Sequence, residues 1–322
     1  MPAPTNTLTT LTSVGQREDL TDIMERVEAE QTPFYTQARK TRATSRRHDW
    51  QTETLAAPAV NAQLEGDDIG TFSAPNLTAR VSNICQIFRK DGVLSRTAQV
   101  VEHAGRADEM RRQRVVKTLE LRRDIELSML SNSASRNEAG ANARLSAGIR
   151  AWVTTNSSVG ATGALGGFNT GTSIVDAATP GTNRTFTQAL FLDALQSRFN
   201  ASGQRTMTTA YMSAALKRVA SSFTGISAQR KESGNTAQTT RIIAGADVFV
   251  SDFGEVQMVA HPYGVANACV IVDPDYYGWA TLDGVTTKTL ASDGDNDKFM
   301  ITTEGTLVVH NQRAHAVIHA LT

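Results

Sequence analysis

The sequence predicts an α+β fold, and three observations support this class. Helical segments are mixed along the chain with strand-like segments that we expect to pair antiparallel. The stretch from Gly105 to Leu130 consists of good helix formers and contains no proline. The last part of the chain is a series of strand-rich pieces, such as "ADVFVSDFGEVQMVAH" and "NACVIVDPDYYGWATL".

Composition limits the classes of protein to consider. The 322 residues suffice for two compact subdomains or one elaborated domain, and 40% apolar content with 6% aromatic residues supports small cores. Thirty-two basic residues balance 32 acidic ones, which argues against a protein that coats DNA through its overall charge. Cys85 and Cys269 lie far apart, as expected of buried thiols in a reducing compartment. With no signal-peptide pattern and no apolar run of membrane-spanning length, we expect a soluble, cytosolic chain.

The N-terminal residues are expected to have little core of their own. Residues 1–17 are rich in threonine and indicate an extended arm. The segment "REDLTDIMERVE" then places Leu20, Ile23, Met24 and Val27 on one side of a short amphipathic helix. Pro33 ends this region, because proline cannot continue a helix.

A projecting ribbon is predicted next. The segments "SRRHDWQTETL" and "LTARVSNICQIFRKDGVLS" have strand composition, and a long polar segment with several prolines and glycines joins them. A two-stranded ribbon is marginally stable in water, and its edges invite pairing with another chain. The ribbon therefore lies either on its own subunit or on a neighbour.

A helix from about Glu102 to Asn132 follows, and its apolar and charged residues overlap on the helical wheel. Its arginines lie within the apolar arc, where their stems can cover a core while the guanidinium groups reach outward. Pairs of opposite charge are spaced for ion pairs along the helix: Glu109–Arg112, Glu120–Arg123 and Arg122–Glu126. Residues 155–185 are small and polar and indicate a flexible excursion, before helices and strands resume near Thr185.

No segment supports an enzyme or a cofactor site. The glycines of "SVGATGALGGF" lack the Gly-Lys-Ser/Thr ending of a phosphate loop, and His315 and His319 have no third metal ligand nearby. Asp293 begins a segment with calcium-loop spacing, but Lys298 occupies the position that requires glycine, so an acidic surface turn is the better interpretation. We therefore expect no catalytic residue, no cofactor and no metal, with a metal-dependent enzyme as a remote alternative.

Several short sequence words resemble one family. They run in order across nearly the whole chain: "REDLTDIM", "TPF", "HDWQTETLAA", "EGDD", "QIFRK", "AGRADEM", "LELRRDIE", "SDFG", "DPDYYGWATL" and "TLVVHNQRAHAVI". In these the chain resembles the major capsid proteins of tailed bacteriophages, in the Su-ten-type family with the Hong Kong 97-type shell fold. An encapsulin-like bacterial compartment, which has the same architecture around cargo enzymes, is the nearest alternative.

The resemblance implies a division of the chain into parts. These are an N-arm (1–33), an extended E-loop hairpin (34–95), a peripheral domain with the spine helix and a flexible loop (96–184), an axial domain (185–290), and strands that return to the peripheral domain (291–322). It further implies homo-hexamers and homo-pentamers, a portal partner with possible decoration or scaffolding proteins, weak inner-surface contact with packaged DNA, and no membrane contact. The location implied is the virion, after assembly in the bacterial host cytoplasm.

Charged residues of the ribbon and the spine helix are the candidate contacts between subunits. They are Arg46, Arg47, Glu65, Asp67, Asp68, Arg111, Arg112, Arg122 and Arg123. The acidic group at the ribbon tip either pairs with Arg46 and Arg47 of its own chain or meets basic side chains of a neighbour, where such pairs set register and partner choice.

Overall fold

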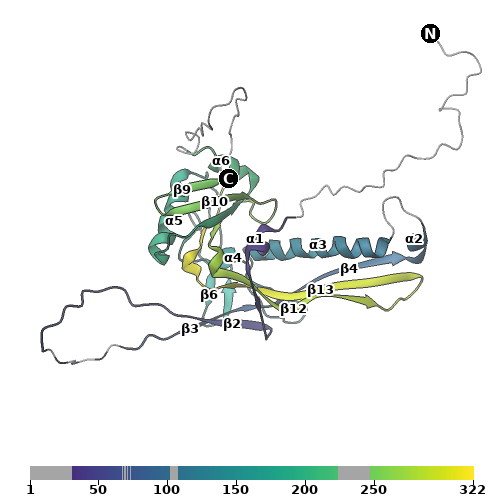
Figure 1. Ribbon diagram of the computed structural model, residues 1–322, viewed down its shortest axis with the longest axis horizontal. Coiled ribbons are helices and arrows are strands. Elements are labelled where there is room, and N and C mark those ends of the chain that lie inside the picture. Colours follow the sequence, from purple (N-terminus) through teal and green to yellow (C-terminus); the bar gives the residue numbers. More distant parts are fainter. Residues whose placement is uncertain are drawn as a thin grey trace, which may run out of the picture.

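Two β-sheets and one long helix organise the protein in the computed structural model, which describes residues 31–66, 68, 70, 72, 74–101, 108–223 and 247–322. The extended arm and the amphipathic helix expected before Pro33 lie outside the described residues. The first sheet runs beside helix α3 (Glu109–Leu130), and the second lies with the shorter helices at one end of the molecule (Figure 1). Among the described segments, no helix is both long and apolar enough to cross a membrane.

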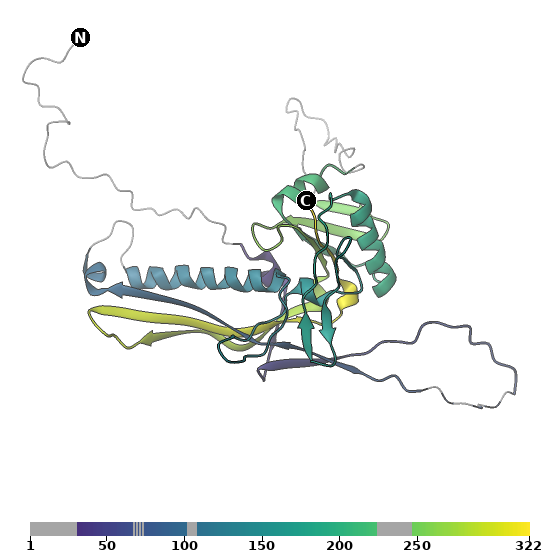
Figure 2. The ribbon, with the colours of Figure 1, turned by 180° about the vertical axis from the view of Figure 1, so that it is seen from behind.

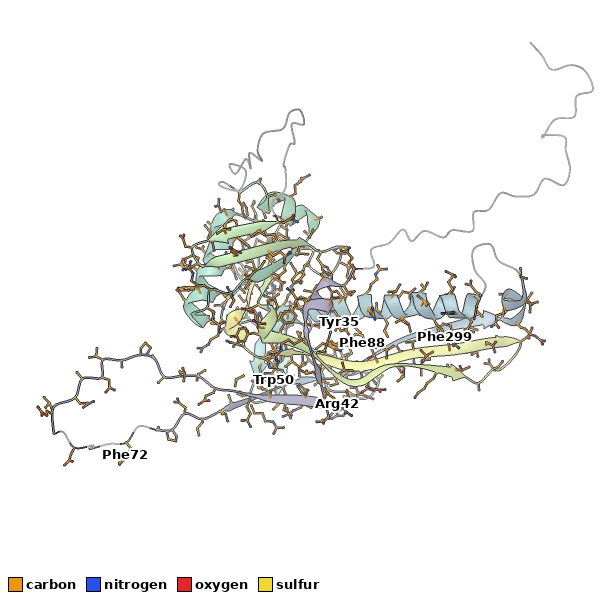
Figure 3. The ribbon with its side chains drawn as sticks, viewed as in Figure 1. Tyr35, Arg42, Trp50, Phe72, Phe88 and Phe299 are labelled. Carbon is orange, nitrogen blue, oxygen red and sulfur yellow. The ribbon has the colours of Figure 1, made fainter. Side chains whose placement is uncertain are left out.

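The first sheet has four strands. Their order is β1 (Arg39–Arg42), β12 (Tyr277–Leu290), β13 (Asn296–Val309) and β4 (Gln86–Ser95). Strands β12 and β13 form a long antiparallel hairpin, β4 is antiparallel to β13, and β1 is parallel to β12. Helix α3 packs on β4 and β13, with Phe88 and Phe299 in the core between them (Figure 3). The short helix α2 (Arg96–Val100) follows β4 and begins at Ser95, whose side chain accepts a hydrogen bond from the Ala98 amide.

Helix α3 buries its apolar residues mainly in its C-terminal half. Asp108 caps its start by accepting a hydrogen bond from the Arg111 amide at 3.0 Å, so the helix begins at Glu109, seven residues after the predicted start at Glu102. It ends at Leu130, two residues before the predicted end. Leu121, Ile125 and Met129 are fully buried. Exposed charged residues and buried apolar residues are thus separated along the length of the helix. Its first turns lie on the surface of the sheet, and its last turns enter the core.

The ion pairs of α3 differ in part from the predicted ones. Arg112 and Glu109 pair at 2.7 Å, as predicted from their spacing. Glu120 pairs with Lys117 at 3.0 Å instead of Arg123. The predicted Arg122–Glu126 pair is wrong, because the Glu126 side chain faces the core and Arg122 faces solvent.

The second sheet has six strands. Their order is β5 (Ser157–Ser158), β14 (Ala316–Ile318), β11 (Cys269–Val272), β8 (Thr208–Met212), β10 (Gly254–Ala260) and β9 (Val248–Ser251). Helices α5 (Gln188–Ser202) and α6 (Ala214–Ala220) flank it, and Thr187 and Ser213 cap their starts through side-chain hydrogen bonds. Phe191, Phe249 and Leu216 belong to a second hydrophobic core, separate from the one under α3.

Two expected boundaries differ from the observed sheets. The expectation placed residues 185–290 in one unit and residues 291–322 in another. Strand β12 instead pairs with β13 in the four-stranded sheet, and β14 lies inside the six-stranded sheet. Both strands have ordinary strand composition, and only their hydrogen-bonding partners decide which sheet they join.

The segment 155–185 is also more ordered than its composition indicated. It contains the hairpin of β6 (Gly167–Asn169) and β7 (Ile174–Asp176), followed by further backbone hydrogen bonds between Ala164 and Thr179. Val175 is fully buried, and the Phe168 ring stacks on Trp152 of α4 (Ile149–Trp152) with an interplanar angle of 3°. These apolar anchors fix a segment whose other residues are small and polar.

A two-stranded ribbon completes the fold. Strands β2 (Arg47–Thr52) and β3 (Ala79–Ile84) pair antiparallel, and the intervening chain projects far from the body in both views (Figures 1 and 2). Before the ribbon, the short helix α1 (Pro33–Gln37) packs against α3. Two 3₁₀ turns, η1 (Pro274–Tyr276) and η2 (Gln312–Ala314), connect the later strands.

Candidate inter-subunit interface

Residues 53–78, here called the projecting loop, form the surface of this chain that most clearly lacks a partner. Its described residues form no helix or strand. In its described residues the only hydrogen bond within the loop joins the Gln63 and Asn61 side chains at 3.0 Å, and none reaches the body of the protein beyond the ribbon base. A segment of this length in a compact protein normally carries a function or remains without fixed structure.

The projecting loop exposes large apolar side chains. They are, with their exposed fractions, Leu55 (88%), Val60 (98%), Leu64 (82%), Phe72 (82%) and Leu77 (84%). Phe72 lies on the projecting loop, away from both sheets (Figure 3). An exposed apolar surface with this extent is typical of a protein–protein interaction site.

The charge of the projecting loop has one sign. Its ionisable residues are Glu53, Glu65, Asp67 and Asp68, and it has no lysine or arginine. Glu65 and Asp68 are exposed and form no ion pair with any described residue, while Asp67 lies outside the described residues. A binding surface for this loop therefore needs both apolar and basic side chains.

The ribbon base uses one of the candidate arginines locally. Arg47 pairs with Asp49 at 2.9 Å, and Arg80 pairs with the other carboxylate oxygen of Asp49. Burial alone raises the pKa of Asp49, but hydrogen bonds from Arg80 and Arg47 and their charges lower it overall. Arg46 forms no ion pair with a described residue, so neither of these arginines pairs with the described acidic residues of the tip.

A buried carboxylate anchors the chain just before the ribbon. Glu126 of α3 is fully buried, and its side chain accepts hydrogen bonds from the backbone amides of Phe34 (2.8 Å) and Tyr35 (2.5 Å) in α1. His261 Nε2 lies 2.8 Å from the same carboxylate, and both side chains are inaccessible to solvent. Amide groups at the start of a helix lack intrahelical partners, so a carboxylate there satisfies them and fixes the helix in place.

Tyrosine hydroxyls hold the other side of α1. The Tyr277 hydroxyl donates to the Phe34 carbonyl oxygen at 3.2 Å, and the Tyr211 hydroxyl donates to the Gln37 side chain at 2.7 Å. The rings of Phe34 and Tyr277 stack with centroids 4.5 Å apart. Burial raises the pKa of both tyrosines, which keeps their hydroxyls protonated and able to donate.

The arginines of α3 fall into two groups. Arg112 is paired with Glu109, and the guanidinium of Arg123 lies 5.5 Å from the centre of the Tyr263 ring. Arg111 and Arg122 are exposed and form no ion pair with a described residue. Burial lowers the pKa of Lys40, on the neighbouring β1, to about 8. The charge of Glu126 opposes this shift, and the charge of Arg122 adds to it. The surface of α3 around Arg122 is therefore basic.

Asp293 and the two cysteines, which were considered above as possible ligands or thiols, have surroundings that explain them without a functional site. Asp293 pairs with Lys298 in the turn between β12 and β13. Cys85 and Cys269 are free and buried, and burial raises the pKa of their thiols to about 11 and about 12. Within the described ranges, no group of three or more histidine, cysteine or acidic side chains is arranged to hold a metal ion.

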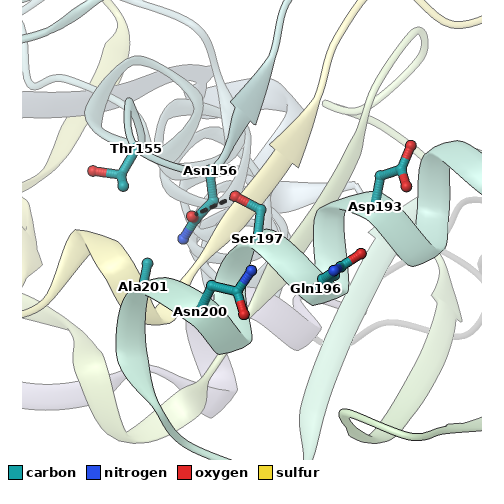
Figure 4. Close-up of a pocket in the computed structure, with 7 residues that line it drawn as sticks. All are labelled: Thr155, Asn156, Asp193, Gln196, Ser197, Asn200 and Ala201. Carbon is teal, nitrogen blue, oxygen red and sulfur yellow. Dashed lines mark hydrogen bonds between the residues drawn. The ribbon is translucent and has the colours of Figure 1, made fainter.

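A shallow hollow of about 430 Å³ beside α5 is polar (Figure 4). Its lining residues are Thr155, Asn156, Asp193, Gln196, Ser197, Asn200 and Ala201. The Ser197 hydroxyl donates to the Asn156 side chain at 2.9 Å, and Asp193 is the only ionisable group in the lining. A single carboxylate has no acid–base partner in this hollow, so its residues do not form a catalytic pair.

The folds of several solved phage capsids match this architecture. The capsid asymmetric unit of cyanophage A-1(L) has a TM-score of 0.64 at 13% identity, over 98% of this chain and 100% of that chain. The structure titled "Gordonia phage Cozz" has a TM-score of 0.60 at 12% identity, over 100% and 97%. A structure of Phage G gp27 major capsid proteins and gp26 decoration proteins has a TM-score of 0.52 at 11% identity, over 94% of each chain.

These similarities show the Hong Kong 97-type fold. No curated protein sequence matches the chain. The model of the family described as SU10 major capsid protein matches residues 3–322, which is nearly the whole sequence. The chain belongs to the SU10 major capsid protein family, and it is a structural protein of the phage virion.

Proposed function

We propose that this major capsid protein assembles into hexamers and pentamers, which close into an icosahedral shell around the double-stranded DNA of a tailed bacteriophage. The projecting loop is the observation that carries this proposal. Its described residues have exposed apolar side chains and no hydrogen bond to the body of the protein, so the loop requires a surface that its own subunit does not supply. Head-to-tail contacts between identical subunits provide such a surface at every position of a closed ring.

The parts of the subunit take the following roles in this proposal. Residues 1–33 are the N-arm, and residues 34–95 contain the E-loop, whose free part is the projecting loop. The four-stranded sheet with α3 is the peripheral domain, and the six-stranded sheet with α5 and α6 is the axial domain that points to the centre of each ring. A hydrophobic core of its own, between α5, α6 and one face of the six-stranded sheet, supports the axial assignment, while Tyr211, Val270 and Val317 of the same sheet belong to the core under α3 and join the two parts.

We further propose which charges meet between subunits. The acidic tip, with Glu65, Asp67 and Asp68, contacts basic side chains of an adjoining subunit, for which Arg46, Arg111 and Arg122 are available. Arginines of α3 that remain exposed after assembly contact packaged DNA weakly, in keeping with a net charge of zero. A portal replaces one pentamer, and decoration proteins, like those in the structure of Phage G, are compatible partners.

Reversal of the tip charge tests this arrangement. The triple substitution Glu65→Lys, Asp67→Lys and Asp68→Lys changes the exposed Glu65 and Asp68 and the residue between them in the sequence, so the circular dichroism spectrum of the subunit should remain that of the wild type. Shell formation, followed by light scattering, should be slow in low salt because like charges then meet, and higher salt should partly restore it by screening. Assembly at the wild-type rate in low salt would rule out a charged contact at the tip.

A further inference from the structure

Arg150, Arg184 and His319 form a partly buried basic cluster in which one nitrogen atom of each side chain lacks a hydrogen-bond partner. Arg150 belongs to α4, Arg184 precedes α5, and His319 follows β14. The Nε atoms of both arginines and Nε2 of His319 are buried and have no hydrogen-bond partner. Buried polar groups nearly always have partners in folded proteins, so these three atoms, which are themselves closed to solvent, mark a basic cluster that is short of acceptors and of negative charge.

The charge of this cluster is also uncompensated. Arg150 Nη2 lies 3.4 Å from His319 Nδ1, and Arg184 Nη2 donates to the Ser158 hydroxyl at 2.6 Å and to the Ser158 carbonyl oxygen at 3.0 Å. Neither arginine forms an ion pair with any described carboxylate. Burial, followed by the charges of Arg150 and Arg184, lowers the pKa of His319 to about 4, so the imidazole is neutral near pH 7.

A cavity of about 400 Å³ opens beside this cluster. Arg150 lines it, together with Asn183 and Asn267, whose side-chain amides form no hydrogen bond with a described residue. Its volume is within the range of roughly 300–1,000 Å³ that is typical of small-molecule sites. The donors at this cavity are therefore a guanidinium group and two free amides.

The cavity wall includes strained backbone. Ala320 has a φ of 54°, in the left-handed region that residues other than glycine rarely occupy, and Gly264, which also lines the cavity, has a φ of 93°. The Ala320 carbonyl oxygen accepts a hydrogen bond from the Arg184 amide at 2.8 Å, which links the strained residue to the cluster. Strain of this kind persists where the surrounding structure holds it, and it is common at binding sites.

We propose that this cavity binds a small oxyanion, with the Arg150 guanidinium as the main contact and Asn183 and Asn267 as additional donors. An oxyanion supplies the negative charge that the cluster lacks and an acceptor for the Arg150 side chain that lines the cavity, whereas a water molecule supplies only the acceptor. Free inorganic phosphate has this chemistry. A carboxylate side chain of a second copy of this chain has the same chemistry and could take its place in the assembled shell.

Phosphate titration of the full-length protein tests the site. Isothermal titration calorimetry, in chloride buffer at constant ionic strength, should show one saturable site on the unassembled wild-type protein. Asn183→Asp places a negative charge at the exposed mouth of the cavity, where it should weaken phosphate binding at least about tenfold without loss of fold. Arg150→Gln should remove the binding.

Asn200→Asp is the matched control, because Asn200 is an exposed asparagine that lines the hollow beside α5. It should keep the wild-type affinity within about twofold. Binding to both free subunits and shells identifies a free anion as the ligand, and binding to free subunits alone identifies a carboxylate of the second copy. No saturable binding to the wild-type protein, or equal affinity in the wild type and Asn183→Asp, would overturn the proposal.

Discussion

Glu126→Gln should loosen the anchor of α1, because glutamine has almost the same shape as glutamate but only one acceptor atom. In the wild type, one carboxylate oxygen of Glu126 accepts from the Phe34 amide and lies 2.8 Å from His261, and the other accepts from the Tyr35 amide. In the variant, the new NH₂ group faces one of these donors and leaves it unpaired. A lost charge-assisted hydrogen bond costs about 1.5–3 kcal/mol and an unpaired buried donor costs about 1–3 kcal/mol, so we expect a loss of about 2.5–6 kcal/mol.

Denaturant unfolding of the unassembled subunit measures this loss, and Glu120→Gln on the same helix is its control. Glu120 pairs with Lys117, and both side chains are partly exposed, so the control should lose about 0.3–0.5 kcal/mol. Trypsin should also cleave after Lys40 faster in Glu126→Gln, because β1 directly follows the loosened helix. Equal stabilities of the two variants would refute the reasoning that the buried carboxylate holds α1.

Three further predictions concern the loop, the sheet and pH. Leu64→Ala should raise the subunit concentration needed for assembly about tenfold or more, because a neighbour that buries Leu64 gains about 0.8 kcal/mol per CH₂. The control is Leu165→Ala, since Leu165 is an exposed leucine outside the loop, and it should change this concentration less than about threefold. Gly305→Ala puts a Cβ 2.4 Å from an indole ring and should cost about 1–3 kcal/mol in thermal unfolding, whereas Gly284→Ala meets no atom within 4 Å and should be neutral. The pKa of His319 is lowered to about 4, below its unfolded value of about 6.5, so the contribution of the neutral imidazole to stability is complete above pH 6.5 and falls as the pH drops toward 4. The unfolding midpoint should therefore decline less steeply with falling pH in His319→Asn than in the wild type.

The features predicted well from the sequence depend on local chemistry. Helix α3 was expected because its residues are good helix formers, and Asp108 caps it through a local hydrogen bond. The ribbon was expected because two strand-like segments flank a connection with no apolar periodicity. Each of these signals lies within a few turns of the chain, so no knowledge of distant contacts is needed.

The features that the sequence did not predict depend on distant contacts. Glu126 lies in "DIELSML", among apolar neighbours, and that position is the signal for a buried carboxylate; its partners in α1 and at His261 are 91 to 135 residues away. The spacing rule instead favoured a pair with Arg122. In the same way, the sheet that β12 joins depends on its pairing with β13, which strand composition does not specify.

The accessibility of the projecting loop before and after assembly tests the central claim most directly. A single reporter thiol is introduced by Leu64→Cys, and the native cysteines are silent because Cys85 and Cys269 are buried and their thiol pKa values are raised to about 11 and about 12. If a neighbouring subunit covers the loop, the alkylation rate of the reporter should fall by at least about tenfold between free subunits and assembled shells. An equal rate in both states would contradict the claim that the loop is completed by a second copy of the chain.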